Sequence, residues 1–233
     1  MNNEITILYR DEELVVCLKP AGVDSQGSSF ENMVDLLRKQ LALPDPREIY
    51  PVHRLDRGVG GVMVYALSRP FAAELNRQIA EHRWEKTYLC IVSGKPEKQG
   101  RMENLLLHRA GENKTYVVSR VRKGVRRAAL VYRRIGYLPQ QDCSLCVVRL
   151  LTGRSHQIRA QFSHRGFPLL GDRRYGSKVG GSIALFSCGL TFYHPKTGEK
   201  RSFCQMPKGE KWEDFSEILS EYSQKSLEIP DNL

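Results

Sequence analysis

Residues 53–67 decide how the chain is interpreted, and their sequence is His-Arg-Leu-Asp-Arg-Gly-Val-Gly-Gly-Val-Met-Val-Tyr-Ala-Leu. The apolar run from Val62 to Leu67 predicts a strand, and the glycines before it allow a backbone to come close to a ligand. Asp56 stands at the start of this Gly-rich turn between Arg54 and Arg57, and these cations favour an ionised carboxylate. A structural Asp that caps a turn fits the same spacing. The glycines lead into a strand and not into a helix, so a nucleotide-hydrolysing loop is disfavoured.

The segments on both sides predict strands interspersed with helices. Helical spacing of apolar residues occurs in residues 31–43, 69–83, 156–164 and 213–222, and the prolines at 44 and 46 end the first helix. Strand-like runs occur in residues 5–9, 14–18, 62–67, 87–92, 115–118, 128–135, 143–151 and 183–192. This order predicts an α/β protein of the α+β type, with a mixed, mostly antiparallel sheet and flanking helices. We expect one domain over residues 1–233, with a frayed tail at about 224–233.

The charge of the chain favours a polyanionic partner. The 233 residues carry a formal net charge of +10, with a pI near 9.4. A basic protein of this size favours nucleic acid before an anionic membrane. Residues 120–134 hold many cations and no acid, and Arg126 and Arg127 in this stretch are expected to contact nucleic acid. Charges on a solvated β-hairpin are the alternative interpretation of the same stretch.

The cysteines and the chain ends point away from metal and membrane. Cys143 and Cys146 form a lone C-x-x-C without a second pair or a His pair at zinc spacing, so we expect neither metal nor redox use. The first residues lack the basic and apolar segments of a signal peptide, and no apolar run approaches the roughly 18 residues of a membrane span. We therefore expect a cytoplasmic protein without a metal or membrane partner.

A second informative stretch is residues 151–159, Leu-Thr-Gly-Arg-Ser-His-Gln-Ile-Arg. Ser155 is the expected N-cap of a short helix, whose first turn offers N–H groups and a positive dipole end to an anion. Arg159 lies one turn along and can project from that helix toward a site. A solvated basic helix face is the alternative, and His156 and Gln157 fit local hydrogen bonding equally well.

Four motifs in this order resemble the RluA-type pseudouridine synthases over nearly the whole chain. They are Lys19-Pro-Ala-Gly22; His53-Arg-Leu-Asp56 followed by Gly61 and Ala66; Lys86-x-Tyr88; and Gly153-Arg-Ser-His-Gln-Ile-Arg159 followed by Gly171-Asp-x-x-Tyr-Gly176. The resemblance implies the pseudouridine synthase catalytic fold without an N-terminal S4 domain. One departure is Val59-Gly60, where the family usually has Thr-Ser, and it changes the local hydrogen bonding.

The resemblance also implies a function: isomerisation of specific uridines in structured ribosomal or transfer RNA to pseudouridine, without cofactor or metal. Asp56 is implied as the catalytic carboxylate, Arg159 as the cation that pairs with it, and Tyr88 as the ring that stacks on the uracil. Ile158 would close the apolar side of the pocket, and Arg54 would fill the space that the extruded uridine leaves. Further contacts to RNA or uridine are expected from His53, Arg154, His156, Gln157, Arg126 and Arg127. A monomer is expected.

Two other functions fit part of this pattern. An RNA chaperone on the same fold would explain Val59-Gly60, but pure binding needs no trio of Asp, Tyr and Arg. A glycosidase-like hydrolase would need a second carboxylate opposite Asp56. Asp172 and Glu85 are the acids to consider for that role, and release of free uracil would reveal it.

Overall fold

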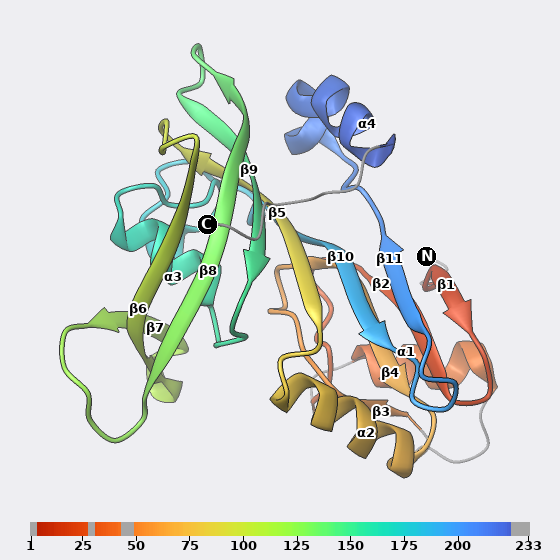
Figure 1. Cartoon of the computed structure of the whole chain (residues 1–233). Helices are drawn as coiled ribbons and strands as arrows, with labels where there is room; N and C mark the ends of the chain where they lie inside the picture. The colour runs from red at the N-terminus through yellow and green to blue at the C-terminus, as the bar shows by residue number, and fades with distance from the viewer. Residues whose placement is uncertain (1–3, 28–30, 43–48, 225–233) are drawn as a thin grey trace. The chain divides into compact units, whose positions relative to one another are not determined.

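The computed structural model describes residues 4–27, 31–42 and 49–224, and the chain divides into two compact units (Figure 1). Unit 1 consists of Met1–Lys86 and Ser187–Gln205, and unit 2 of Thr87–Phe186 and Met206–Leu233. The chain therefore changes unit three times: within β5 (Glu85–Ser93), within β10 (Leu185–Tyr193) and after Gln205. The single domain predicted from the sequence stays a prediction. Residues 225–233 of the expected tail and the helix-ending prolines 44 and 46 lie outside the described residues.

Unit 1 is built on a sheet in which β1, β2, β4 and β10 follow one another, with β3 on β4 and β11 on β10. Its other elements are β1 (Ile7–Arg10), β2 (Leu14–Lys19), α1 (Met33–Leu41), β3 (Tyr50–Pro51), β4 (Gly60–Ala66), α2 (Arg69–Ala80) and β11 (Lys200–Cys204). β2 and β4 pair antiparallel, with Leu14 opposite Ala66 and Lys19 opposite Gly61. This register brings the end of β2 next to the Gly-rich turn that opens β4.

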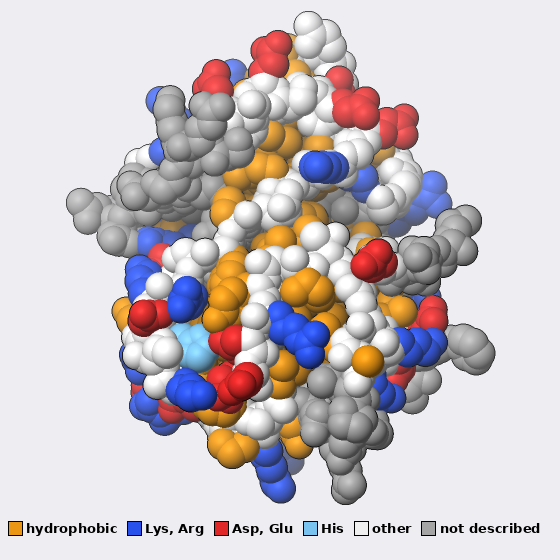
Figure 2. Space-filling view, turned by 90° about the vertical axis from the view of Figure 1, so that its right-hand side faces the viewer, with side chains coloured by type: hydrophobic (Ala, Val, Ile, Leu, Met, Phe, Trp, Pro, Cys, Tyr) orange, Lys and Arg blue, Asp and Glu red, His pale blue; other side chains and the backbone are white. Residues whose placement is uncertain are grey.

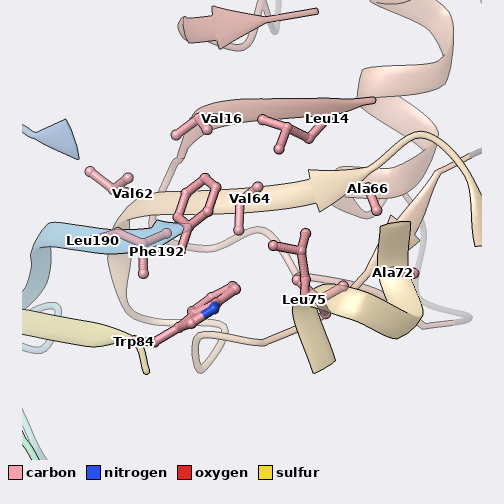
Figure 3. Close-up of a cluster of buried hydrophobic side chains, with 11 residues drawn as sticks. Leu14, Val16, Val62, Val64, Ala66, Ala72, Leu75, Trp84, Leu190 and Phe192 are labelled. Atoms are coloured by element: carbon pink, nitrogen blue, oxygen red, sulfur yellow. The ribbon is translucent and has the colours of Figure 1, made fainter. Parts of the chain in front are cut away.

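The core of unit 1 lies between this sheet and α2 (Figure 3). Ala72 and Leu75 of α2 pack toward side chains of β2, β4 and β10, among them Val64 and Phe192. Every residue of β4 is buried, which explains why its sequence is continuously apolar and does not alternate. Burial of each such aliphatic side chain contributes roughly 1.5–3 kcal/mol, so this cluster is a main source of the stability of unit 1.

Unit 2 contains five neighbouring strands in the order β5-β9-β8-β6-β7. Its other elements are β6 (Gln99–Arg109), η2 (Ala110–Glu112), β7 (Lys114–Val118), β8 (Val125–Leu138), β9 (Cys143–Leu150), α3 (Gln157–His164), η3 (Arg173–Tyr175), η4 (Glu210–Phe215) and α4 (Ser216–Gln224). Leu106, Ala128, Ala160 and Tyr175 form a buried cluster with Val117 packed against it. This cluster fixes α3 and η3 on the face formed by β6, β7 and β8.

The predicted fold class is confirmed. Within the described residues, every strand pairing with a described register is antiparallel, and helices flank the strands. The sequence did not predict β6 or β11. In β6 only Met102 and Leu106 are buried, and its one apolar run is the three leucines at 105–107; β11 alternates between exposed and half-buried side chains. Neither strand therefore carries an apolar run over most of its length.

The predicted N-cap of α3 is wrong. The cap position is occupied by His156, which has a left-handed backbone (φ 52°) and makes no side-chain cap hydrogen bond. The carbonyl oxygen of Ser155 instead accepts a hydrogen bond from the Thr115 hydroxyl of β7 at 2.8 Å. This bond ties the turn before α3 to β7 through the Ser155 carbonyl oxygen, and it does not cap the helix.

All six cysteines are free thiols. Cys143 and Cys146 are both buried as free thiols, three residues apart in β9, so they point to opposite faces of the strand. Across residues 4–27, 31–42 and 49–224, no group of three or more His, Cys, Asp or Glu side chains is arranged to hold a metal ion. In the same ranges, no helix has the length and apolar character needed to cross a bilayer. The face in Figure 2 mixes cationic, acidic and apolar side chains.

Candidate catalytic site

Asp56 lies on the loop between β3 and β4, and a buried serine fixes the residue before it. Ser25 Oγ donates to the carbonyl oxygen of Leu55 at 2.9 Å, and the Leu55 N–H donates back to Ser25 Oγ at 3.0 Å. Ser25 is buried, and the Tyr65 hydroxyl donates to its carbonyl oxygen at 2.9 Å. The Asp56 carbonyl accepts the Val59 N–H at 2.9 Å, which closes the turn after it. Because buried backbone groups require partners, these bonds fix the path of the chain into and out of Asp56.

Lys19, at the end of β2, fixes the chain after Asp56. Its ammonium group donates to the carbonyl oxygens of Pro20 at 2.9 Å, Val23 at 2.6 Å and Arg57 at 3.2 Å. Burial lowers the pKa of Lys19 to about 8. The three donors of an ammonium group match the three carbonyl oxygens, so Lys19 joins the first motif to the loop that carries Asp56.

Gly22 and Gly61 both have a positive φ at this loop, and only Gly61 is also required by a close approach. The Gly22 N–H donates to the Arg57 carbonyl oxygen at 2.7 Å, and Arg57 Nε donates to the Gly22 carbonyl oxygen at 2.9 Å. Gly61 has φ 132°, and a Cβ at this position would lie 2.3 Å from the carbonyl oxygen of Ser187 in β10. Only glycine therefore allows β4 to approach β10 directly after the loop of Asp56.

His53 is turned into unit 1. Its Nε2 accepts the Val64 N–H at 3.1 Å, and its ring meets the edge of Trp84 with the centroids 5.4 Å apart. Burial lowers the pKa of His53 well below its ordinary value, and the charge of Lys86 acts in the same direction. His53 is therefore a neutral imidazole with its proton on Nδ1. Its expected RNA contact stays a prediction, and the neighbouring Arg54 is exposed.

Arg159, in α3 of unit 2, is held by a buried carboxylate. Its Nε lies 2.7 Å from Oδ2 of Asp172, and its Nη2 lies 2.9 Å from Oδ1 of the same residue. The side chains of Arg159 and Asp172 are only 6% and 1% exposed. This side-on, two-point pair fixes the plane and the direction of the guanidinium group. Tyr88 is buried in β5 of the same unit.

A tyrosine packs on the guanidinium of Arg159. The ring centroid of Tyr175 lies 4.8 Å from the central carbon of Arg159. The Tyr175 hydroxyl accepts the Thr115 N–H at 2.7 Å and lies 2.9 Å from His156 Nδ1. Thr115 Oγ1 gives its proton to the Ser155 carbonyl, so the 3.0 Å contact between Thr115 Oγ1 and His108 requires a proton on His108 Nδ1.

The remaining predicted residues of the fourth motif, at positions 153–159, divide into internal and exposed groups. Gln157 is buried: its Oε1 accepts the Thr152 hydroxyl at 2.8 Å and the Arg154 N–H at 3.0 Å. Ile158 is buried as well. Arg154 is exposed, and its Nε donates to the carbonyl oxygen of Arg127 at 3.1 Å. Gln157 therefore braces the turn before α3, and Arg154 lies beside the basic stretch.

Arg126 and Arg127 lie at the start of β8, where both side chains are exposed. They stand opposite Leu106 and Leu105 of β6, so they point to opposite faces of the sheet. The structure thus groups the predicted residues by unit. Unit 1 holds Arg54, His53 and Asp56, and unit 2 holds Tyr88, Arg126, Arg127, Arg154, His156, Gln157, Ile158 and Arg159.

Sequence reasoning missed the residues that hold these groups in place. Ser25 carries no motif signal because its partner, Leu55, is thirty residues away in the chain. Asp172 was placed in the fourth motif and considered as a second carboxylate of a hydrolase, but its pairing with Arg159 was not predicted. The Gly-Asp-x-x-Tyr-Gly spacing was the available signal, since it places Asp172 and Tyr175 one turn apart.

The fold is that of RNA pseudouridylate synthase domains. The human protein "RNA Pseudouridylate Synthase Domain Containing 1" matches with a TM-score of 0.75 at 19% identity, over 99% of this chain and 98% of that one. A second human protein, "RNA Pseudouridylate Synthase Domain Containing 4", matches with a TM-score of 0.72 at 21% identity, over 97% and 95% of the two chains.

Sequence comparison extends this likeness from fold to family. The model of the family described as "RNA pseudouridylate synthase" matches residues 13–164. The "tRNA pseudouridine synthase C" of Haemophilus ducreyi is 30% identical over 84% of this chain and 88% of that protein. The "Dual-specificity RNA pseudouridine synthase RluA" of Salmonella typhimurium is 31% identical over 85% and 91%. The chain belongs to the RNA pseudouridylate synthase family, so the predicted enzyme class is confirmed.

Proposed function

We propose that this enzyme converts specific uridines of structured ribosomal or transfer RNA to pseudouridine, with Asp56 as the catalytic carboxylate. The observation that carries the proposal is the loop of Asp56, which lies within the residues matched by the family model and is fixed on both sides by buried hydrogen bonds. A group that must stay close to the ribose–uracil junction benefits from such a rigid support.

The other roles follow the resemblance residue by residue. Arg159 pairs with Asp56 and favours its charged form, and Tyr88 stacks on the uracil of the extruded nucleotide. Ile158 forms the apolar wall of the pocket, and Arg54 occupies the space left in the RNA stack. The overall change breaks the N1–C1′ bond and forms a C5–C1′ bond, while C5 loses its proton to solvent and N1 takes one up. Nothing is oxidised or reduced, so neither a redox cofactor nor a metal is required.

The kind of RNA follows from the relatives only as a class. One relative is named for transfer RNA, another for the large ribosomal subunit and a third for dual specificity. We therefore propose structured RNA of either kind as the substrate, recognised through shape more than through a base code. Action as a monomer in the cytoplasm stays a prediction.

Tritium release tests the reaction. Purified protein is incubated with transfer and ribosomal RNA labelled at uracil C5, beside Asp56→Asn and Glu85→Gln. Glu85 is an exposed carboxylate of unit 1 that pairs with Lys200 and serves as the matched control. We expect release by the wild type and by Glu85→Gln, and none by Asp56→Asn. Binding without release would favour an RNA chaperone, and free uracil would indicate a glycosidase.

The basic stretch at the start of β8 gives a second test. Arg126→Glu together with Arg127→Glu should weaken RNA binding and reduce the slope of log affinity against log salt by about two, because each phosphate contact releases about one counterion. Lys39→Glu with Arg77→Glu makes the same change of net charge on the exposed helices of unit 1. An equal loss in both double variants, or an unchanged salt slope, would contradict a local phosphate contact.

A further inference from the structure

We propose that Asp172 and Tyr175 are positioning residues that act through Arg159: together they fix the guanidinium group in the one orientation that serves the reaction. This inference rests on the proposed catalytic role of Arg159. It concerns residues beyond position 164, where the match to the family model ends. It gives a structural role to the Gly-Asp-x-x-Tyr-Gly segment, which was used above only as a sequence motif of the family.

The first argument is the geometry of the pair. Asp172 engages Nε and Nη2, which lie on one edge of the guanidinium plane. A two-point contact on this edge sets the directions of the Nη1 donors, because the guanidinium is planar. A contact through a single nitrogen would leave the guanidinium group able to rotate about the bonds of its long side chain. The near-complete burial of both partners removes competition from water.

The second argument is the contact between the Tyr175 ring and the guanidinium group of Arg159. Tyr175 stands 4.8 Å from the central carbon of Arg159, a distance at which a cation–π contact adds to the orientation. Tyr175 is itself immobile: Thr115 holds its hydroxyl, and Ser163 Oγ donates to its carbonyl oxygen at 2.6 Å. Its ring is also part of the buried cluster with Leu106. The orientation of Arg159 is therefore set by groups from β7, α3 and η3.

The third argument is the backbone that presents Asp172. The Gly171 N–H donates to Ser177 Oγ at 3.1 Å, and the N–H groups of Tyr175 and Ser177 donate to the Asp172 carbonyl oxygen at 3.0 and 3.1 Å. Gly171 has φ 78°, and a Cβ there would lie 2.1 Å from the carbonyl oxygen of Ser182. The turn is thus built so closely that the carboxylate has little freedom to follow a displaced arginine.

The test combines kinetics with a direct view of Arg159. Single-turnover rates and RNA affinity are measured for Asp172→Asn, Tyr175→Leu and Tyr175→Phe, and for Asp172→Asn in an Arg159→Met background. The ¹⁵N–¹H NMR signal of the Arg159 Nε–H is recorded for each variant that keeps Arg159. Thermal unfolding shows which variants are folded, and Tyr175→Phe keeps the ring if the leucine variant does not fold.

We expect Asp172→Asn to lower the rate by about 100-fold with RNA affinity nearly unchanged, as for a misplaced catalytic group. Tyr175→Leu should lower it by about 10-fold, and Tyr175→Phe much less, because the ring remains. In the Arg159→Met background, Asp172→Asn should change the rate by less than about 2-fold, since residues that act through one another are not additive. The slowly exchanging Nε–H signal should be lost in Asp172→Asn.

Three results would overturn the inference: an unchanged rate in Asp172→Asn, an equal loss in the Arg159→Met background, or an unchanged Nε–H signal. Failure of the proposed catalytic role of Arg159 would give a different result, because the Arg159→Met variant would then modify RNA as fast as the wild type. Even if no RNA were modified, the Nε–H signal would still decide whether Asp172 and Tyr175 hold Arg159.

Discussion

The loop of Asp56 and the helix of Arg159 are both rigid, but different forces hold them. In unit 1, Ser25 and Tyr65 fix the loop through neutral hydrogen bonds to backbone groups, and Lys19 adds three more to carbonyl oxygens. In unit 2, a buried pair of opposite charges fixes Arg159. The loop of Asp56 is thus supported through its backbone, whereas the guanidinium group of Arg159 is supported through its side chain.

This difference has a physical reason. The described hydrogen bonds around Asp56 are made to the neighbouring peptide groups, so they fix the backbone that carries the carboxylate. An arginine has five donors, and a carboxylate can take two of them while the rest keep their directions. The two regions should therefore respond differently when one supporting residue is removed.

The largest effect on stability is expected in unit 2. Arg159→Met leaves the carboxylate of Asp172 buried without its cation, and removal of one partner from such a pair costs about 3–5 kcal/mol. Adding Asp172→Asn should restore much of that loss, because the uncompensated charge disappears. Denaturant unfolding of the single and double variants measures both values.

The control for this prediction is Arg77→Met, which removes an exposed arginine that pairs with Glu74 and Glu81 on α2. Its free energy of unfolding should change far less than that of Arg159→Met, because exposed pairs are screened by water. Equal losses in the two variants would show that burial does not distinguish the pair of unit 2.

A smaller effect is expected from the loop of Asp56. Ser25→Ala leaves the Leu55 N–H and carbonyl groups without their buried partner, which should cost about 1–3 kcal/mol of stability and slow the reaction. Ser187→Ala is the matched control, because Ser187 is equally buried but makes one longer bond, 3.3 Å, to the Val62 carbonyl oxygen. If Ser187→Ala slows the reaction as much as Ser25→Ala, the two hydrogen bonds between Ser25 and Leu55 have no special role in the reaction.

The smallest effect concerns a third carboxylate, Asp11, in the turn between β1 and β2. Burial alone would raise the pKa of Asp11, but hydrogen bonds from Tyr9, the N–H groups of Glu13 and Leu14, and His194 outweigh it and lower the pKa from 3.8 to about 2. Because the folded pKa lies below the ordinary value, the stabilisation is present above pH 4 and is lost as the pH falls toward 2.

Asp11→Asn should remove this part of the acid sensitivity. The expected change is about 1 kcal/mol, since Asp11 is partly exposed and water screens its contacts. Unfolding at several pH values between 2 and 7 measures it. Identical pH profiles of Asp11→Asn and the wild type would show that unit 1 gains nothing from this carboxylate.

The sequence predicted those parts of the fold that have a strong local signal. β2, β4 and α2 carry continuous or periodic apolar residues, and all three lie where they were expected. β6 was missed because its eleven residues include only two buried side chains. Its pairing with β7 and β8 comes from distant parts of the chain and not from its own composition.

The candidate site shows the same division. Asp56, Tyr88 and Arg159 stand in motifs and were named from the sequence, and their roles stay predictions. Ser25 could not be assigned, because a hydrogen bond across thirty residues leaves no periodic pattern. Asp172 stood in a motif, but that motif did not indicate its buried pair with Arg159. Sequence motifs therefore identified the groups proposed for chemistry, and the structure added the groups that hold them.

The most direct test of the account is the single-turnover rate of Asp56→Asn with excess protein over a responsive RNA, measured by tritium release beside RNA affinity. The account predicts a loss of at least about 10,000-fold in rate, as for removal of a central catalytic group, with affinity unchanged. A rate within about 10-fold of the wild type would contradict it, because a carboxylate that only shapes a turn would be replaced by asparagine at small cost.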